Sequence, residues 1–398
     1  MTATTTGRHQ PLDHLVLAGV LVLLAVEPTA VGIGSENADV DVTRWVIRLV
    51  TYGLAFAAFL VWTPSLSRLR APLGWLLATG LALMIMAPWG LNPVGDALVA
   101  FGVLVTVLYA VTVVDRLGFD RVMLVTLAVL TVVVTIGLAD SIGDARSSGL
   151  SGGANGFGIQ GALVVVLATH RWLRSTSPVW LLLVPIGMAA TIASDSRVAL
   201  LAIAVGIFML VRDVLPPLSA VLVVIVVAAA LVSTLSADIA TDVAVEASRS
   251  GEAEEIATLT GRTDIWSASV DAVQARPLTG WGITGVREVY LDAFERGELA
   301  FEVQDGHNVL VQLTLMGGII PAVLFAAAAL SYLLRLSAST VRLRDALVAM
   351  VLIHGITEAV VSAEPRLFWF LFALALASAA GAGRGHPSLR SPSTAMAP

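Results

Sequence analysis

The 398-residue sequence contains no cysteine and no lysine, and only 13% of its residues are charged. The absence of cysteine excludes disulfide bonds and thiolate chemistry. Because lysine is also absent, every basic residue other than histidine is an arginine. The charged fraction is about half of the quarter that soluble domains usually carry, which argues against a water-soluble fold.

Hydrophobic residues make up 57% of the chain and gather in long apolar runs. The runs are roughly 17–22 residues long, enough to cross the hydrocarbon core of a bilayer as helices. The first run has no small-residue cleavage site, so we expect it to stay as a membrane helix. The pattern predicts an all-α, polytopic membrane bundle of about twelve spans, with approximate limits 13–33, 45–63, 72–88, 97–114, 122–138, 157–169, 178–193, 197–211, 216–235, 308–334, 346–361 and 367–381.

The gaps between the runs alternate in charge. One set is basic and contains Arg68, Arg70, Arg116, Arg121, Arg171, Arg174, Arg212, Arg335, Arg342 and Arg344. The other set is acidic and contains Glu36, Asp39, Asp41, Asp140 and Asp144. Since arginine-rich loops face the cytoplasm, we expect a cytoplasmic N-terminus (1–12), spans one to nine (13–235), an extracytoplasmic loop (236–306), spans ten to twelve (307–381) and a disordered cytoplasmic tail (382–398).

The long polar loop, residues 236–306, has a pattern of its own. Apolar residues recur on one helix face after Gly261-Arg262, and Pro277 should end that helix. The apolar positions are Ile265, Trp266, Val270 and Val273. The glycines at 280, 282 and 285 predict a tight turn before a second amphipathic helix near 286–295. Such helices suit the surface of a membrane bundle.

Arg197 follows Ser194-Asp195-Ser196 at the start of an apolar run. Capping by Ser194 or Asp195 would be an ordinary structural explanation of this segment. A cation in the first turn of a helix opposes the helix dipole, however, and a bound phosphate would reverse that penalty. We therefore favour an anion-binding role for Arg197.

His307 stands where the polar loop meets the next apolar run. Its unperturbed pKa of about 6.5 allows a neutral, proton-accepting ring. The alternative is a structural histidine, with Asp305 and Asn308 capping the helix that follows. Gly317 and Gly318 would let another helix approach closely and place His307 over a cavity.

Other polar groups in or near the apolar runs have both a functional and a structural interpretation. His354 and Glu358 are four residues apart and would bond each other on one helix face. Asp39 and Asp41 would offer carboxylates to a metal, but we favour an ordinary acidic loop because no histidine is near.

Ordinary surface pairing is the simplest account of Arg276, Arg287 and Arg296. Glu27, Glu364 and Arg366 are the remaining groups of this kind.

Together these motifs resemble the O-antigen ligase and O-antigen polymerase family of bacterial envelope glycosyltransferases. The most specific match is His307-Asn308, a nine-residue spacer and Gly318. Asn155-Gly156-x-Gly158 before the sixth run and Ser196-Arg197 before the eighth also match. The family usually has Gly, Thr or Tyr three residues after that spacer glycine, where this chain has Pro321.

The resemblance implies a GT-C-type membrane fold and a glycan donor on undecaprenyl diphosphate, transferred at the outer face of the plasma membrane to a glycan or lipid acceptor. It implies inverting transfer without a metal or other cofactor, and no nucleic-acid partner. His307 would be the base, and Arg197 and Arg262 would bind the diphosphate. The supporting candidates are Asn155, Asn308, Arg276, Glu364 and Arg366.

Three alternatives remain open at this point. A polysaccharide polymerase of the same family would share the donor and differ only in the acceptor. A bicarbonate-like transporter would also fit about twelve spans, although transporters place their polar site near the middle of the membrane. A structural subunit of an envelope synthase would need none of the candidate residues for activity.

Overall fold

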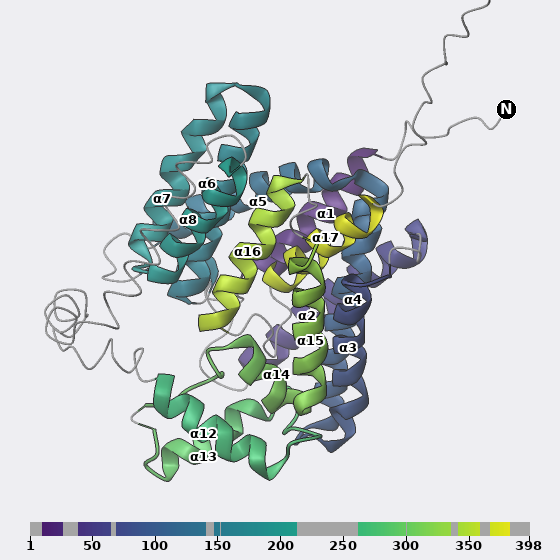
Figure 1. Cartoon of the computed structure of the whole chain (residues 1–398), viewed down its shortest axis with the longest axis vertical. Helices are drawn as coiled ribbons and strands as arrows, with labels where there is room; N and C mark the ends of the chain where they lie inside the picture. The colour runs from purple at the N-terminus through teal and green to yellow at the C-terminus, as the bar shows by residue number, and fades with distance from the viewer. Residues whose placement is uncertain are drawn as a thin grey trace, which may run out of the picture.

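The computed structural model describes residues 10–26, 39–64, 69–140, 147–151, 153–212, 262–299, 301–335, 341–358 and 367–382. Within these ranges every regular element is a helix (Figure 1). The α-helices are α1 (Gln10–Ala25), α2 (Asp39–Trp62), α3 (Leu73–Met86), α4 (Pro93–Leu117), α5 (Phe119–Asp140), α6 (Ala154–Ser175), α7 (Val184–Ala193), α8 (Arg197–Val211), α12 (Arg262–Ala275), α13 (Val286–Glu295), α14 (Val309–Gly317), α15 (Ile319–Leu333), α16 (Arg342–Thr357) and α17 (Leu367–Ala382). The predicted all-α class is confirmed for these residues.

Among the described residues, three helices are long and apolar enough to cross a membrane. They are α4, α5 and the part of α2 from Trp45 to Trp62. Other helices, including α8, α15 and α17, are apolar but shorter. The chain is therefore a helical membrane protein, while the expected run at 216–235 lies outside the described residues and the count of about twelve spans stays a prediction.

The interior of the bundle is built around α17. All side chains from Leu367 to Ala377 are buried, which is typical of a helix that is apolar on every side. The indole nitrogen of Trp369 donates to the carbonyl oxygen of Val103 in α4 at 3.2 Å. This bond satisfies the one polar atom of a fully buried ring.

Helices α6, α7 and α8 pack together on one side of the bundle (Figure 1). The approach of α6 to α7 is close because both carry glycine at the contact. A Cβ added at Gly161 would lie 2.5 Å from the carbonyl oxygen of Gly187, and the reverse is also true. Small residues at such crossings let two backbones pack directly.

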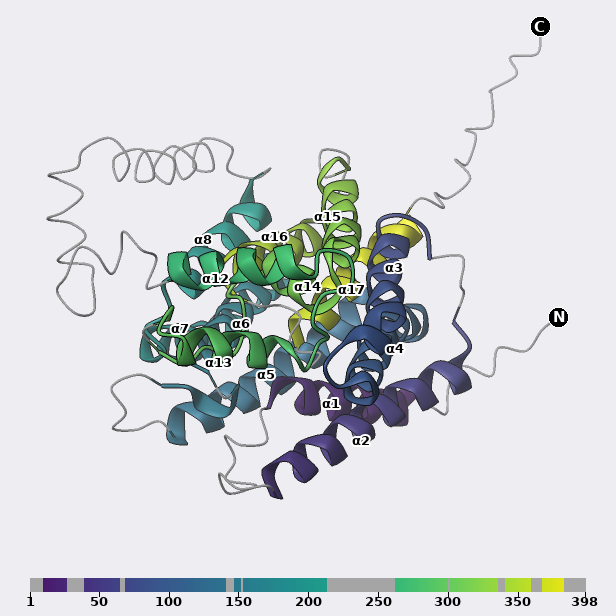
Figure 2. The same cartoon turned by 90° about the horizontal axis from the view of Figure 1, so that it is seen from below.

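The polar segment after Arg262 folds as expected. Helix α12 ends at Ala275, before Pro277, and α13 spans Val286–Glu295. Between them Gly280 and Gly282 adopt φ values of +65° and +91°, which glycine reaches without a steric cost. Figure 1 places α12 and α13 at one end of the molecule, and Figure 2 views the molecule from that end.

The expected helix over 308–334 is wrong, because the structure divides it at Gly318 into α14 and α15. Gly318 has a φ of +76°, and a Cβ there would lie 2.3 Å from the backbone of Leu278. The close approach that we expected from a helix is therefore made by the turn after α12. Pro321 lies in the first turn of α15, where a proline needs no hydrogen-bond donor.

Two other boundaries differ from the prediction. Asp39 and Asp41 belong to the first turn of α2 rather than to a loop. The run at 178–193 begins as a 3-10 helix, η5 (Pro178–Leu183), before it continues as α7. Pro185 in the first turn of α7 accounts for the change, since its ring fits the start of a helix but not the interior.

Candidate functional site

Residues 305–308, between α13 and α14, form a tight turn that we call the histidine turn. His307 has a φ of +44°, in the left-handed region that residues other than glycine rarely adopt. Its backbone N–H donates to Oδ1 of Asp305 at 3.0 Å. Strain of this kind persists where surrounding contacts fix the backbone, and it is frequent at functional sites.

Neighbouring helices hold the histidine turn in place. The indole nitrogen of Trp266 in α12 donates to the carbonyl oxygen of Gly306 at 3.1 Å. The N–H of Gly306 donates to Oε1 of Gln312 in α14 at 2.9 Å. Oδ1 of Asn308 accepts the N–H groups of Leu310 and Val311, so Asn308 caps α14 as expected. Asp305, the other expected cap, accepts the N–H of His307 instead.

The turn also packs against a buried tyrosine. Tyr290 in α13 is fully buried, and its hydroxyl lies 2.7 Å from the hydroxyl of Ser269 in α12. Burial raises the pKa of Tyr290, so the phenol stays neutral. A Cβ at Gly306 would lie 3.0 Å from this hydroxyl, which explains why the residue before His307 is a glycine.

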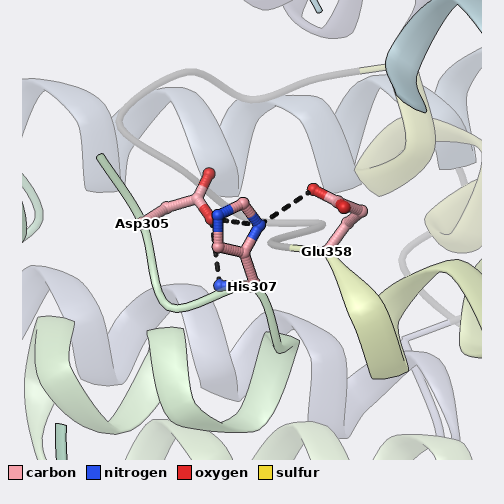
Figure 3. Close-up of side chains that lie close together, drawn as sticks. All are labelled: Asp305, His307 and Glu358. Atoms are coloured by element: carbon pink, nitrogen blue, oxygen red, sulfur yellow. Dashed lines mark hydrogen bonds and ion pairs between the residues drawn. The ribbon is translucent and has the colours of Figure 1, made fainter. Parts of the chain in front are cut away.

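The imidazole of His307 lies between two carboxylates (Figure 3). Its Nδ1 is 3.4 Å from Oε2 of Glu358 and 3.6 Å from Oδ1 of Asp305. The His307 side chain is 30% exposed, whereas those of Asp305 and Glu358 are 19% and 14% exposed. The ring is therefore reachable from solvent, while the carboxylates beside it are largely covered.

Glu358 comes to the histidine from a distant part of the chain. It follows the last residue of α16 and has an extended backbone, with φ −143° and ψ 155°. Its Oε1 accepts a hydrogen bond from Nδ2 of Asn155 in α6 at 2.6 Å. Nδ2 of Asn308 donates to the carbonyl oxygen of Ile356 at 3.0 Å. The start of α6, the end of α16 and the histidine turn thus meet at one place.

The expected placement of His354 and Glu358 on one helix face is wrong. Because α16 ends at Thr357, Glu358 has left the helix, and its carboxylate contacts Asn155 and His307. The ring of His354 packs against that of Phe368, with the centroids 4.7 Å apart.

Arg197 is the first residue of α8 and is exposed. The cap of this helix is Ser196, whose hydroxyl accepts the N–H of Ala199 at 3.3 Å, and not Ser194 or Asp195 as expected. Gly158 of α6 packs against this turn, since a Cβ at Gly158 would lie 2.8 Å from the Cβ of Ser196. Gly158 is one helical turn after Asn155, so α6 connects the start of α8 to the asparagine that contacts Glu358.

The other basic candidates are placed differently. Arg262 is the first residue of α12, one turn before Trp266, but its side chain lies outside the described residues. The guanidinium of Arg276 stacks on Trp281, 4.2 Å from the ring centroid, and donates to the carbonyl oxygen of Trp89 at 3.4 Å. Arg276 therefore packs the turn after α12 and is not brought to His307 by these contacts.

Ordinary surface pairing is confirmed for Arg287 and Arg296. Arg287 pairs with Glu302 at 2.9 Å, and Arg296 pairs with Glu298 at 2.7 Å and with Asp292. Glu27, Glu364 and Arg366 lie outside the described residues, so their expected roles remain predictions.

The histidine turn offers two kinds of chemistry. Asp305, His307 and Glu358 each present one ligand atom, and these atoms lie within 4.8 Å of one another. Such a set of nitrogen and oxygen donors would suit a divalent ion such as Zn²⁺ or Mn²⁺. The same arrangement of an imidazole oriented by a carboxylate would also suit a general base.

Comparison with known proteins identifies a family for part of the chain. No curated protein matches the chain. The O-antigen ligase family matches residues 179–326, a range that includes Arg197, the polar segment and the histidine turn. The chain therefore carries an O-antigen ligase domain, which supports the family resemblance of the sequence motifs over this range.

Proposed function

We propose that this protein transfers a glycan from undecaprenyl diphosphate to an acceptor hydroxyl at the outer face of the bacterial plasma membrane, with His307 as the base. One observation carries the proposal. An imidazole is held in a strained backbone conformation between two carboxylates, inside the region that matches the O-antigen ligase family. Strained, well-supported side chains of this kind are typical of reacting groups.

The reaction is a single displacement at the anomeric carbon of the donor sugar. The acceptor oxygen forms the new bond to that carbon as the bond to the phosphate oxygen breaks. The proton of the acceptor hydroxyl goes to His307, and the diphosphate leaves with the electron pair. A base in this position typically contributes ~10²–10⁴-fold to the rate.

Fixed cations would stabilise the diphosphate as its charge increases. In a chain without lysine, arginine must supply them, and its planar fork binds phosphate oxygens in pairs. We assign this role to Arg197 and Arg262. The position of Arg197 at the start of α8, beside the Gly158 contact, supports the assignment. Arg276 is left out because it stacks on Trp281.

Ligase activity is our first choice for this site, and polymerase activity is the alternative within the family. The two differ in the acceptor, which is a different terminal molecule for a ligase and another lipid-linked repeat for a polymerase. Products that lengthen in a ladder without an added acceptor would identify a polymerase.

The test is transfer by detergent-purified protein from a radiolabelled undecaprenyl-diphosphate oligosaccharide to a panel of acceptors. We expect wild-type protein to transfer in EDTA. His307→Asn should lose at least ~10²-fold, and it is a better variant than His307→Ala because asparagine tolerates the left-handed backbone. Arg197→Ala should raise the donor KM and lower kcat. Wild-type rates in His307→Asn, or solute uptake that persists in it without any transfer, would contradict the proposal.

A further inference from the structure

We infer that Glu358, anchored by Asn155, is a positioning residue that fixes the tautomer and orientation of His307. The inference rests on the proposed function, because it concerns how His307 accepts a proton. Glu358 touches the imidazole, so we place its action on the histidine and not on the reacting sugar.

The two oxygens of Glu358 have separate partners. Oε1 accepts from Nδ2 of Asn155 at 2.6 Å, and Oε2 faces Nδ1 of His307 at 3.4 Å. Asn155 is 203 residues from Glu358 in the sequence, and His307 is 51 residues away. The asparagine orients the carboxylate, and the carboxylate in turn orients the ring. A contact of 3.4 Å is long for a hydrogen bond, and such contacts tend to shorten when a substrate binds.

The chemistry of a carboxylate decides the tautomer. An ionised carboxylate only accepts hydrogen bonds, so Nδ1 must carry the hydrogen that points toward Oε2. In a neutral imidazole the other nitrogen, Nε2, then holds the lone pair. We therefore assign proton acceptance to Nε2, the nitrogen at the opposite edge of the ring from Glu358. When Nε2 takes the acceptor proton, the ring becomes positive, and Glu358 stabilises that charge.

Asp305 is also close to Nδ1, but its contacts point to another role. Its Oδ1 accepts the backbone N–H of His307 at 3.0 Å and lies 3.6 Å from Nδ1. This bond supports the left-handed backbone at position 307. Asp305 thus shapes the turn, while Glu358, which approaches from α16, aims the side chain.

A metal ion held by the same three side chains is the competing interpretation. A metal on Nδ1 would displace the hydrogen that the positioning role requires. The two interpretations therefore predict opposite responses to chelation, which the test below uses.

The test compares Glu358→Gln and Glu358→Asp in the transfer assay, with Glu298→Gln as the matched control at an exposed ion pair. We expect Glu358→Gln to lose about 10²-fold in kcat. The donor KM should change less than about 3-fold, because the variant keeps the contacts that bind the donor in the ground state. The acidic limb of its pH–rate profile should move to lower pH, since a lost negative charge disfavours the protonated ring. Glu358→Asp should recover part of the rate and keep the wild-type limb, and Glu298→Gln should match wild type throughout.

Added to His307→Asn, Glu358→Gln should cause no further loss, because both act on the same proton transfer. Wild-type kcat and pH profile in Glu358→Gln, while His307→Asn is inactive, would overturn the inference and leave the proposed function standing. Wild-type transfer by His307→Asn would overturn both. Loss of wild-type transfer in EDTA, restored by Zn²⁺ or Mn²⁺, would replace the positioning role with a metal site.

If Glu358→Gln fails to fold, Asn155→Ala provides the second test. This variant keeps the carboxylate and removes its anchor, and we expect kcat to fall about 10-fold at an unchanged donor KM. A wild-type kcat in Asn155→Ala would overturn the inference in that case.

Discussion

Replacing Asp345 with alanine should strongly destabilise the protein. The Asp345 side chain is fully buried in the first turn of α16. Its carboxylate accepts hydrogen bonds from Nη2 of Arg212 at 2.9 Å and from the hydroxyl of Tyr332 at 2.5 Å. Nε of Arg344 donates to the same hydroxyl at 3.1 Å. One carboxylate therefore joins α16 to the ends of α8 and α15.

The magnitude follows from burial. The side chains of Arg212 and Arg344 are 18% and 7% exposed, so water screens them poorly once the carboxylate is gone. Removing one partner of such a buried pair costs about 3–5 kcal/mol. Asp345→Asn keeps the shape and part of the hydrogen bonding, and should cost about 1–3 kcal/mol. Tyr332→Phe removes a single hydroxyl and should cost about 1 kcal/mol.

The assay is thermal unfolding in detergent, followed by the fluorescence of the nine tryptophans. We expect Asp345→Ala to lower the Tm by about 4–6 °C, and Asp345→Asn to fall between it and wild type. Glu298→Gln at an exposed pair serves as the control and should leave the Tm unchanged. If Asp345→Ala had the same Tm as the Glu298→Gln control, the reasoning from burial and charge would be refuted.

Further predictions concern the supports of the histidine turn. Trp266→Phe loses the bond to Gly306 and should cost about 1–2 kcal/mol and lower kcat; unchanged unfolding and transfer would argue against this support. Asn308→Ala removes the cap of α14 and should cost about 1–2 kcal/mol in the same unfolding assay. Tyr290 has a raised pKa, so its contribution to stability is present below pH 10 and is lost as pH rises further. Unfolding measured between pH 9 and 11 should therefore show a smaller alkaline loss for Tyr290→Phe than for wild type, and equal slopes would contradict the assigned burial.

The membrane helices could largely be predicted from the lengths of the apolar runs, and the two helices of the polar segment from apolar periodicity. The ends of α12 and α13 followed from Pro277 and from an amphipathic pattern. The break at Gly318 was missed because α14 and α15 are both apolar, so no change in polarity marks their junction. The two helices are divided by a tertiary contact, in which the backbone of residues 277–278 packs against Gly318. The pattern of apolar residues does not encode such a contact.

The candidate site was predicted in part. His307, Asn308 and Asn155 were identified from motifs, and the structure brings them together. The position of Glu358 was not predicted, since its partners are 51 and 203 residues away and its helix ends at Thr357, inside the predicted run 346–361. An ionisable residue near the end of an apolar run was the available signal. That signal indicates that Glu358 needs a polar partner, but it does not identify His307 or Asn155 as the partner.

The turn after α12 is attached to the α14–α15 junction through main-chain atoms. The N–H groups of Trp281 and Gly282 donate to the carbonyl oxygens of Leu315 and Met316, and the N–H of Ile319 donates to that of Pro277. Main-chain hydrogen bonds of this kind do not depend on which side chains the bonded residues carry. A mutational scan should therefore find exposed Leu278 permissive, while a Cβ at position 280, 282 or 318 would collide with backbone or with Asp96. The surface of the turn after α12 can thus change in sequence while its attachment to the α14–α15 junction stays the same.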